Sequence, residues 1–182
     1  MVITDFLEKN AKFYPNDVAL VEINPANQPN PNITWREFSL IESTPGDKYR
    51  REITWKEFDV RANRFANLLM TRGIKKGDKV AILLMNCIEW LPIYFGILKT
   101  GALAVPMNYR YSADEIKYCA ELADVKFLIF GPEFVERVSA VYDTIPTLEK
   151  CFFVGPTCPD FADSYDRILT ICSSTAPAVE YD

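Results

Sequence analysis

The chain has 182 residues, of which 49% are apolar and 25% charged, and its formal net charge is −5. These proportions are those of an ordinary soluble globular protein, and they argue against a disordered or fibrous protein. The length favours one domain, with two small ones as the alternative. Histidine is absent, which excludes histidine-based catalytic triads, metal sites and proton shuttles within this chain.

The first part of the chain predicts a helix, a strand and a loop. Apolar residues at helical spacing predict a short amphipathic helix over 3–14, with Pro15 just past its end. Residues 18–23, Val-Ala-Leu-Val-Glu-Ile, predict a strand. Residues 24–32 are rich in Pro and Asn and predict a loop.

A near-repeat follows this loop. Ile-Thr-Trp-Arg-Glu-Phe at 33–38 returns as Ile-Thr-Trp-Lys-Glu-Phe at 53–58, and a turn at Pro45-Gly46 lies between the copies. We therefore expect 33–41 and 50–55 to pair as antiparallel strands around that turn. A duplicated boundary segment is the alternative interpretation, and two copies are too few for a solenoid.

A long helix is predicted over 56–72. Thr54 and Glu57 have the spacing of a capping box at its start, and apolar residues then recur at helical spacing. Gly73 suits the position directly after the last turn.

Beyond residue 78, short apolar runs alternate with helical patterns. The runs predict strands near 79–85, 102–106, 126–130 and 151–154, and the patterns predict helices near 87–100, 113–123 and 133–143. Asn86 with Glu89, and Ser112 with Glu115, are the candidate caps. This alternation is typical of right-handed βαβ units, so the expected fold class is α/β, a mostly parallel sheet with helices on both faces. Residues 173–182 are expected to form a poorly ordered tail.

The cysteines do not indicate a metal site. They contain no CxxC pair and are odd in number, which favours reduced, mostly buried cytosolic residues (Cys87, Cys119, Cys151, Cys158 and Cys172). Cys87 lies near a predicted helix start, where its thiolate would be favoured. The interpretation that we prefer is a small buried residue in the first helical turn.

The sequence shows no targeting or membrane signal. The N-terminus lacks a basic and an apolar region, so no signal peptide is visible. The apolar stretch 80–109 is divided by Pro and Gly into pieces shorter than the ~20 residues of a spanning helix. A cytoplasmic location is therefore expected.

A basic region has two interpretations. Residues 48–79 carry ten Lys and Arg against four Asp and Glu, which suits either a polyanionic partner or a solvated helix face. Because no groove-binding motif accompanies the charge, we favour the solvated face and expect no nucleic-acid partner.

Motifs of several enzyme classes are missing. The seven glycines form neither a G-x-G nor a Walker arrangement, which argues against a dinucleotide or P-loop site. Ser112 and Ser139 lack the nucleophile elbow of serine hydrolases. The adjacent Asp114 and Glu115 fall in a predicted first helical turn, where they complement the helix dipole rather than form a catalytic pair. Pattern alone thus indicates an α/β domain without its own active site.

Several segments between residues 53 and 130 agree in order and spacing with a known family. They are Ile53–Phe58, Arg61–Ala66, Gly73–Ile82, Asn86 with Glu89-Trp90, Gly96–Ala102, Val105–Asn108, Ser112–Ile116 and Lys126–Phe130. In this order they resemble the AMP-forming acyl-CoA synthetases of the adenylate-forming superfamily. The resemblance extends more loosely to 1–23 and 131–182.

The resemblance implies the fold of the first part of the acetyl-CoA synthetase-like N-terminal domain. It implies that the intact enzyme couples a carboxylic acid, such as a fatty acid, to ATP with magnesium, releases pyrophosphate, and transfers the acyl group from the adenylate to coenzyme A. The family's phosphate loop is expected soon after 176–182, and its later motifs fall outside this chain. The chain is therefore expected to hold no cofactor, and no catalytic, cofactor-binding or metal residue is assigned. Residues 24–52 exceed the family's usual spacing and look like an inserted loop or hairpin.

Two functional hypotheses follow from the resemblance. The first is the N-terminal portion of an acyl-CoA ligase, inactive alone and completed by the rest of the polypeptide. The second is a standalone, non-catalytic interaction or regulatory module derived from such an enzyme. An in-frame phosphate loop directly downstream in the nucleotide sequence would favour the first. If the chain stands alone, apolar surface left exposed is expected to cause self-association.

Overall fold

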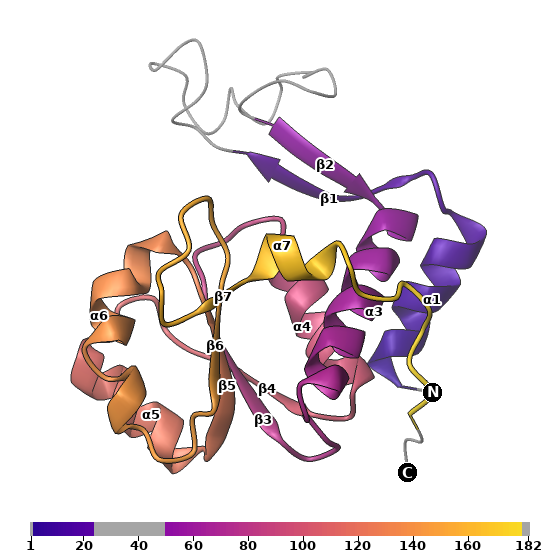
Figure 1. Cartoon of the computed structure of the whole chain (residues 1–182). Helices are drawn as coiled ribbons and strands as arrows, with labels where there is room; N and C mark the ends of the chain where they lie inside the picture. Colours follow the sequence, from indigo (N-terminus) through magenta and orange to yellow (C-terminus); the bar gives the residue numbers. More distant parts are fainter. Residues whose placement is uncertain (1, 24–49, 180–182) are drawn as a thin grey trace, which may run out of the picture.

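Five parallel strands form the central sheet of the computed structural model, which describes residues 2–23 and 50–179 (Figure 1). Neighbouring strands pair in parallel in the spatial order β4-β3-β5-β6-β7. The strands are β3 (Lys79–Leu83), β4 (Leu103–Pro106), β5 (Val125–Phe130), β6 (Lys150–Phe153) and β7 (Asp163–Ser164). The predicted α/β class with a mostly parallel sheet is confirmed.

Helices cover both faces of this sheet (Figure 1). One face carries α3 (Trp55–Thr71), α4 (Trp90–Lys99) and α7 (Tyr165–Leu169), and the other carries α5 (Ala113–Leu122) and α6 (Val135–Ser139). Side chains alternate along β5: Phe127 and Ile129 enter the first core, Leu128 and Phe130 the second. This alternation explains why the strands read as continuous apolar runs in the sequence.

A small antiparallel ribbon lies beside the main sheet. It consists of β1 (Val18–Ile23) and β2 (Arg50–Thr54), and α1 (Ile3–Phe13) precedes it. The ribbon and α1 pack on α3 and the start of α4 through a third apolar cluster of Leu7, Ile53, Phe58, Ala62 and Ile88. The strand predicted at 50–55 is present and pairs with β1. Its predicted partner at 33–41 lies outside the described residues, so that hairpin and the 24–52 insertion stay predictions.

Two of the predicted capping boxes are formed. At α3 the Glu57 N–H donates to Thr54 Oγ1 (3.2 Å) and the Thr54 N–H donates to Glu57 Oε2 (2.8 Å). Ser112 and Glu115 make the same exchange at α5. At the end of α3 the φ of Gly73 is +96°, which lets the Ile74 N–H donate back to the Leu69 carbonyl.

The third predicted cap is wrong. Helix α4 begins at Trp90 rather than near residue 87, and Glu89 takes its cap position without a side-chain cap bond. The Glu89 carboxylate instead accepts hydrogen bonds from the Arg51 guanidinium. The Glu89 side chain therefore pairs with the distant Arg51 instead of capping its own helix.

Two other elements depart from the predictions. The helix expected over 133–143 is divided into a 3₁₀ turn (Pro132–Phe134), α6 and a second 3₁₀ turn (Tyr142–Thr144). The Ser139 hydroxyl donates to the Glu136 carbonyl and the Thr144 hydroxyl to the Val141 carbonyl, which favours short turns over a continuous helix. The elements β7 and α7 lie in a part of the chain for which the sequence predicts no strand or helix. None of the helices described is long and apolar enough to cross a bilayer.

A buried lysine joins three helices. Lys99, at the end of α4, is only 1% exposed. Its ammonium lies 2.7 Å from Glu8 Oε1 of α1 and 3.1 Å from Asp59 Oδ1 of α3. The two carboxylates compensate for the ammonium's loss of hydration.

We expect Lys99→Met to lower the free energy of unfolding by about 3 kcal/mol, because Asp59 would keep a mostly buried charge without this ammonium. Urea denaturation measures the effect. The matched control is Lys117→Met, which removes an exposed i,i+4 pair with Glu121 at 3.9 Å and is expected to change stability by less than about 0.5 kcal/mol. Equal shifts in the two variants would contradict the structural role of Lys99.

Helices α3 and α4 cross closely at Gly96. A Cβ atom added there would lie 2.9 Å from the Ala62 carbonyl oxygen and 3.0 Å from Phe65 Cβ. The position therefore requires glycine for close approach rather than for an unusual backbone angle.

We expect Gly96→Ala to destabilise the protein by about 1–3 kcal/mol, although alanine has the higher helix propensity by about 1 kcal/mol. Thermal unfolding followed by circular dichroism tests this, with Lys117→Ala at a half-exposed position of α5 as the control. A raised melting temperature for Gly96→Ala would show that the two helices do not cross this closely.

Candidate functional site

A cavity of about 610 Å³ opens at the carboxyl ends of the central strands. The chain runs from β3 to β4 on one side and then returns to β5 on the other, so the strand order reverses between β3 and β5. Open parallel sheets bind ligands at this switch point. The cavity is lined by segments that follow three strands and by the ribbon: Glu22, Ile23, Arg51, Leu84–Cys87, Glu89, Gly131–Glu133, Val154–Pro156 and Asp166.

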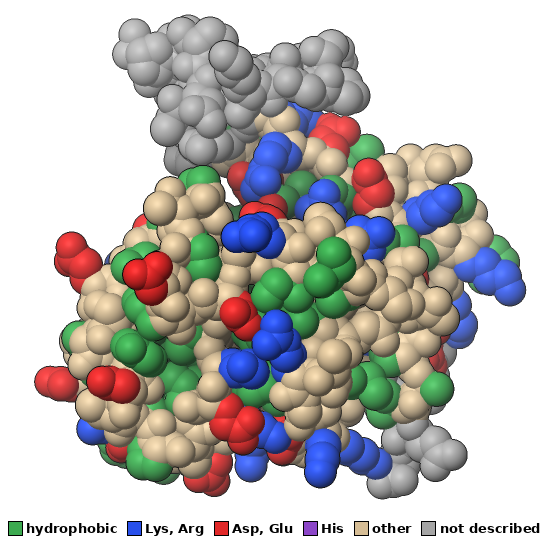
Figure 2. Space-filling view, in the orientation of Figure 1, with side chains coloured by type: hydrophobic (Ala, Val, Ile, Leu, Met, Phe, Trp, Pro, Cys, Tyr) green, Lys and Arg blue, Asp and Glu red, His purple; other side chains and the backbone are tan. Residues whose placement is uncertain are grey.

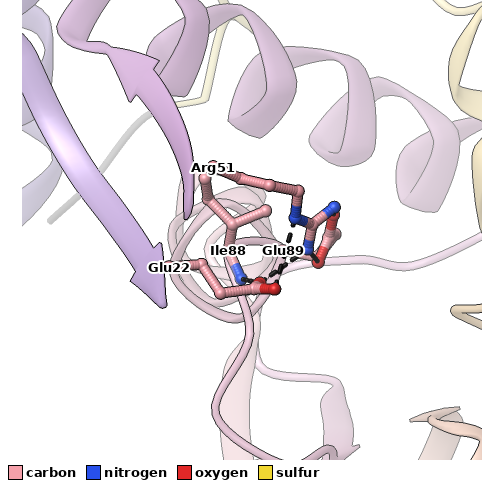
Figure 3. A network of polar contacts seen from close by, with 4 residues as sticks. All are labelled: Glu22, Arg51, Ile88 and Glu89. Carbon is pink, nitrogen blue, oxygen red and sulfur yellow. Dashed lines mark hydrogen bonds and ion pairs between the residues drawn. The ribbon is translucent and has the colours of Figure 1, made fainter. Parts of the chain in front are cut away.

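An ion network borders the cavity (Figure 3). Arg51 of β2 lies between two carboxylates, with Nη2 2.6 Å from Glu22 Oε2 and Nη1 3.1 Å from Glu89 Oε1. The Ile88 N–H also donates to Glu22 Oε2 at 2.6 Å. The network thus ties the β1–β2 ribbon to the segment that leads into α4.

The network keeps Arg51 charged. Partial burial works to lower the pKa of its guanidinium, but hydrogen bonds and charge from Glu22 and Glu89 outweigh burial and raise that pKa. The arginine is therefore already neutralised by protein carboxylates, which reduces its attraction for an added anion.

The cavity wall is acidic. Its lining contains four carboxylates, from Glu22, Glu89, Glu133 and Asp166, and Arg51 is the one basic residue among the described lining residues. Burial and the nearby charge of Glu89 raise the pKa of Asp166. A triphosphate would meet net negative charge from these described residues, and the two glycines among them, Gly131 and Gly155, are not neighbours in the sequence.

In the described part of the chain, no group of three or more Cys, Asp or Glu side chains is placed to hold a metal ion.

An apolar groove of about 310 Å³ adjoins the cavity. It shares Glu22, Ile23, Asn86 and Cys87 with the cavity and continues along Leu20, Val21, Ile88, Trp90 and Leu91. The polar cavity thus lies beside an apolar groove. Together they are large enough to hold part of a small-molecule ligand.

Cys87, the cysteine singled out from the sequence, lines both depressions, but its environment opposes reactivity. Burial and then the charge of Glu89 raise the pKa of its thiol to about 12. The preference for an unreactive, largely buried residue agrees with this environment. Its placement in the first helical turn was wrong, because α4 begins three residues later.

The other residues considered from the sequence do not converge on the cavity. Glu115 caps α5 together with Ser112, and hydrogen bonds from Ser112 lower the pKa of its carboxyl. The Ser139 hydroxyl donates to its own helix. Trp90 and Tyr94 stack with ring centroids 5.4 Å apart and pack against the core.

The basic region 48–79 is partly neutralised by acidic partners. Arg51 pairs with Glu22 and Glu89, and Arg72 lies 3.4 Å from Asp163. Figure 2 shows acidic and basic side chains interspersed on the visible face, with apolar side chains between them. This mixture supports a solvated surface over a polyanion-binding stripe.

Sequence reasoning missed the acidic groups at the cavity. Glu22, Glu89 and Arg51 come together through the pairing of β1 with β2, whose partners are separated by the segment 24–49. Asp166 lies on α7, a helix that the sequence did not predict. The strand order alone would have located the cavity, because it places the switch point after β3 and β5.

We expect Cys87 to react with iodoacetamide at pH 8 on the order of 10³-fold more slowly in the folded chain than in urea, because a raised thiol pKa suppresses the reactive thiolate. Peptide mass spectrometry at Cys87 measures the rate, and the urea-unfolded chain is the control. A folded-state rate close to the unfolded one would contradict the burial of this thiol.

Comparison with known proteins gives a consistent family. The sequence profile described as "AMP-binding enzyme" matches residues 7–158. The chain is 37% identical over 94 residues to a medium/long-chain-fatty-acid–CoA/3-oxocholest-4-en-26-oate–CoA ligase of Mycolicibacterium smegmatis, covering 52% of this chain and 17% of that protein. It is 35% identical over 122 residues to the long-chain-fatty-acid–CoA ligase FadD13 of Mycobacterium tuberculosis, covering 65% and 23%.

Solved structures show the same fold. The inhibitor-bound N-terminal domain of FACL13 from Mycobacterium tuberculosis superposes with a TM-score of 0.74 at 26% identity, covering 98% of this chain and 38% of that one. The anthranilate CoA ligase AuaEII superposes with a TM-score of 0.78 at 24% identity, covering 97% and 29%. The chain thus spans about a quarter or less of the curated relatives. Because the family profile matches most of its residues, the chain belongs to the AMP-binding enzyme family, and the relatives it matches are acyl-CoA ligases.

Proposed function

We propose that this chain is the N-terminal part of an AMP-forming acyl-CoA ligase. The complete reaction converts a carboxylic acid, ATP and coenzyme A into acyl-CoA, AMP and pyrophosphate. The observation that carries the proposal is the family match over 7–158, supported by superposition of nearly the whole chain on the N-terminal domain of FACL13. The names of the curated relatives favour a fatty acid as the carboxylic acid.

The chain supplies a scaffold rather than the chemistry. Adenylation requires donors and positive charge where negative charge develops on the phosphates. The described cavity presents carboxylates and an already paired arginine instead. ATP, magnesium and coenzyme A are therefore assigned to the intact enzyme, and no residue of this chain is assigned a catalytic, cofactor-binding or metal role. A cytoplasmic location remains part of the proposal.

The remainder of the polypeptide is the principal partner in this proposal. Large apolar side chains on α5 and after α7 are more than half exposed, including Tyr118, Leu122 and Ile171. Such surface is available for later parts of a longer chain, and in their absence it favours self-association.

We expect the 182-residue chain to catalyse no ATP–pyrophosphate exchange above a no-enzyme control with short-, medium- or long-chain acids. Binding an acyl tail in the apolar groove would give no transition-state stabilisation and hence no turnover. The comparison protein is the same chain extended to the length of its relatives, which is expected to show exchange.

The outcomes separate the two functional hypotheses. Exchange by the repurified 182-residue chain would contradict its proposed inactivity. A folded extended protein that stays inactive across the acid panel would instead favour a non-catalytic module. Circular dichroism of both proteins checks that a lack of exchange activity is not caused by misfolding.

A further inference from the structure

The segment after α7 runs along α3 (Figure 1, yellow beside purple). Residues 173–179 take no helix or strand conformation. The side-chain amide of Asn67 donates to the carbonyls of Ser173 (2.9 Å) and Thr175 (2.8 Å), and the amide of Asn63 donates to the carbonyl of Ser174 (3.1 Å). Three successive backbone carbonyls are thus held by two side chains of one helix.

The spacing of the two asparagines suits this contact. Residues four apart lie one above the other on a helix face, so both amides point at the same stretch of backbone. Because they bind carbonyls rather than side chains, they fix the path of residues 173–175 independently of side-chain identity. Asparagine supplies two N–H donors in one planar group, which lets Asn67 reach two carbonyls.

Asn63, the more buried of the two asparagines, is also held by a residue of its own helix. Asn63 is 3% exposed, and its amide also donates to Asp59 Oδ2 at 3.0 Å. Asp59 is in turn held by the buried Lys99 ammonium. The contact with the segment is therefore continuous with the charge network among α1, α3 and α4.

The segment leads away from the cavity. Val179 Cγ1 lies 3.4 Å from where a Cβ atom on Gly101 would stand. Gly101 lies in the turn before β4, and its carbonyl accepts from Gly77 before β3. Residue 179 therefore lies at the amino ends of β3 and β4, whereas the cavity lies at the carboxyl ends of β3 and β5.

We infer that Asn63 and Asn67 are positioning residues, forming a backbone clamp that directs the chain along α3 to the amino-terminal edge of the sheet. Resting on the proposed function, this means that the segments following residue 179 in the ligase start from a fixed point on that edge. The clamp can be tested without activity, so its failure and the failure of the proposed function are distinguishable.

The test is limited proteolysis by proteinase K on Asn67→Asp, with cleavage sites identified by mass spectrometry. The carboxylate has nearly the same shape but no N–H donors, and it repels the two carbonyls that Asn67 holds. We expect cleavage within 173–179 to become on the order of tenfold faster, with cleavage in β3 and β5 unchanged. Asn67 is chosen because it is less buried than Asn63 and its variant is more certain to fold. Asn108→Asp, which adds the same charge at an exposed loop, is the matched control and should leave 173–179 unchanged.

A rescue variant separates positioning from general stability. Asn67→Gln keeps both N–H donors and should restore part of the protection at 173–179. An unchanged cleavage rate at 173–179 in Asn67→Asp would overturn the clamp. Faster cleavage throughout the sheet would also overturn it, because the residue would then act on global stability. The same acceleration in Asn67→Gln as in Asn67→Asp would show that the amide donors are not what holds the segment.

Discussion

The buried ammonium group of Lys99 constrains how the helices α1, α3 and α4 pack together. Lys99 ends the apolar helix α4, whose Ile93 and Ile97 pack on the sheet, and it is removed from water almost completely. A charge in that position is tolerated only with carboxylates close by. Glu8 and Asp59 meet this requirement, and in doing so they tie α1 to the α3–α4 pair. Asp59 extends the arrangement by orienting Asn63 toward the segment after α7.

The helix pair that carries this charge also needs close packing. Gly96 lets α4 approach the backbone of α3, and Phe65 of α3 fills the space toward the sheet. Further along, the Arg51 network fastens the β1–β2 ribbon to the start of α4 (Figure 3). The ribbon therefore depends on α3 and α4 rather than on the five-stranded sheet. Its position beside the cavity follows from the way these two helices meet.

The sequence predicts the elements whose signals are local. The apolar runs of β3, β5 and β6 are continuous because both faces are buried, and the capping boxes at Thr54 and Ser112 need only residues three apart. The start of α4 was misplaced because Glu89 serves Arg51, thirty-eight residues earlier. Short β7 and α7 were missed because two and five residues carry too little periodicity.

The candidate site was harder to predict from the sequence than the fold was. The absence of a phosphate-binding motif was readable from the glycine spacing. The acidic wall itself was not readable, because Glu22, Glu89 and Asp166 come from three distant segments. Only the order of the strands and the pairing of β1 with β2 bring them together.

The two edge strands of the five-stranded sheet limit how copies of this chain can associate. At one edge, the Leu103 and Met107 N–H groups donate inward to β3, so the outward positions of β4 are Ala104 and Pro106. Proline has no N–H, which leaves a single donor on that edge within the strand. The opposite edge, β7, has two residues. Neither edge is a good template for adding a foreign strand. Aggregates of the folded chain are therefore not expected to grow by adding strands to this five-stranded sheet.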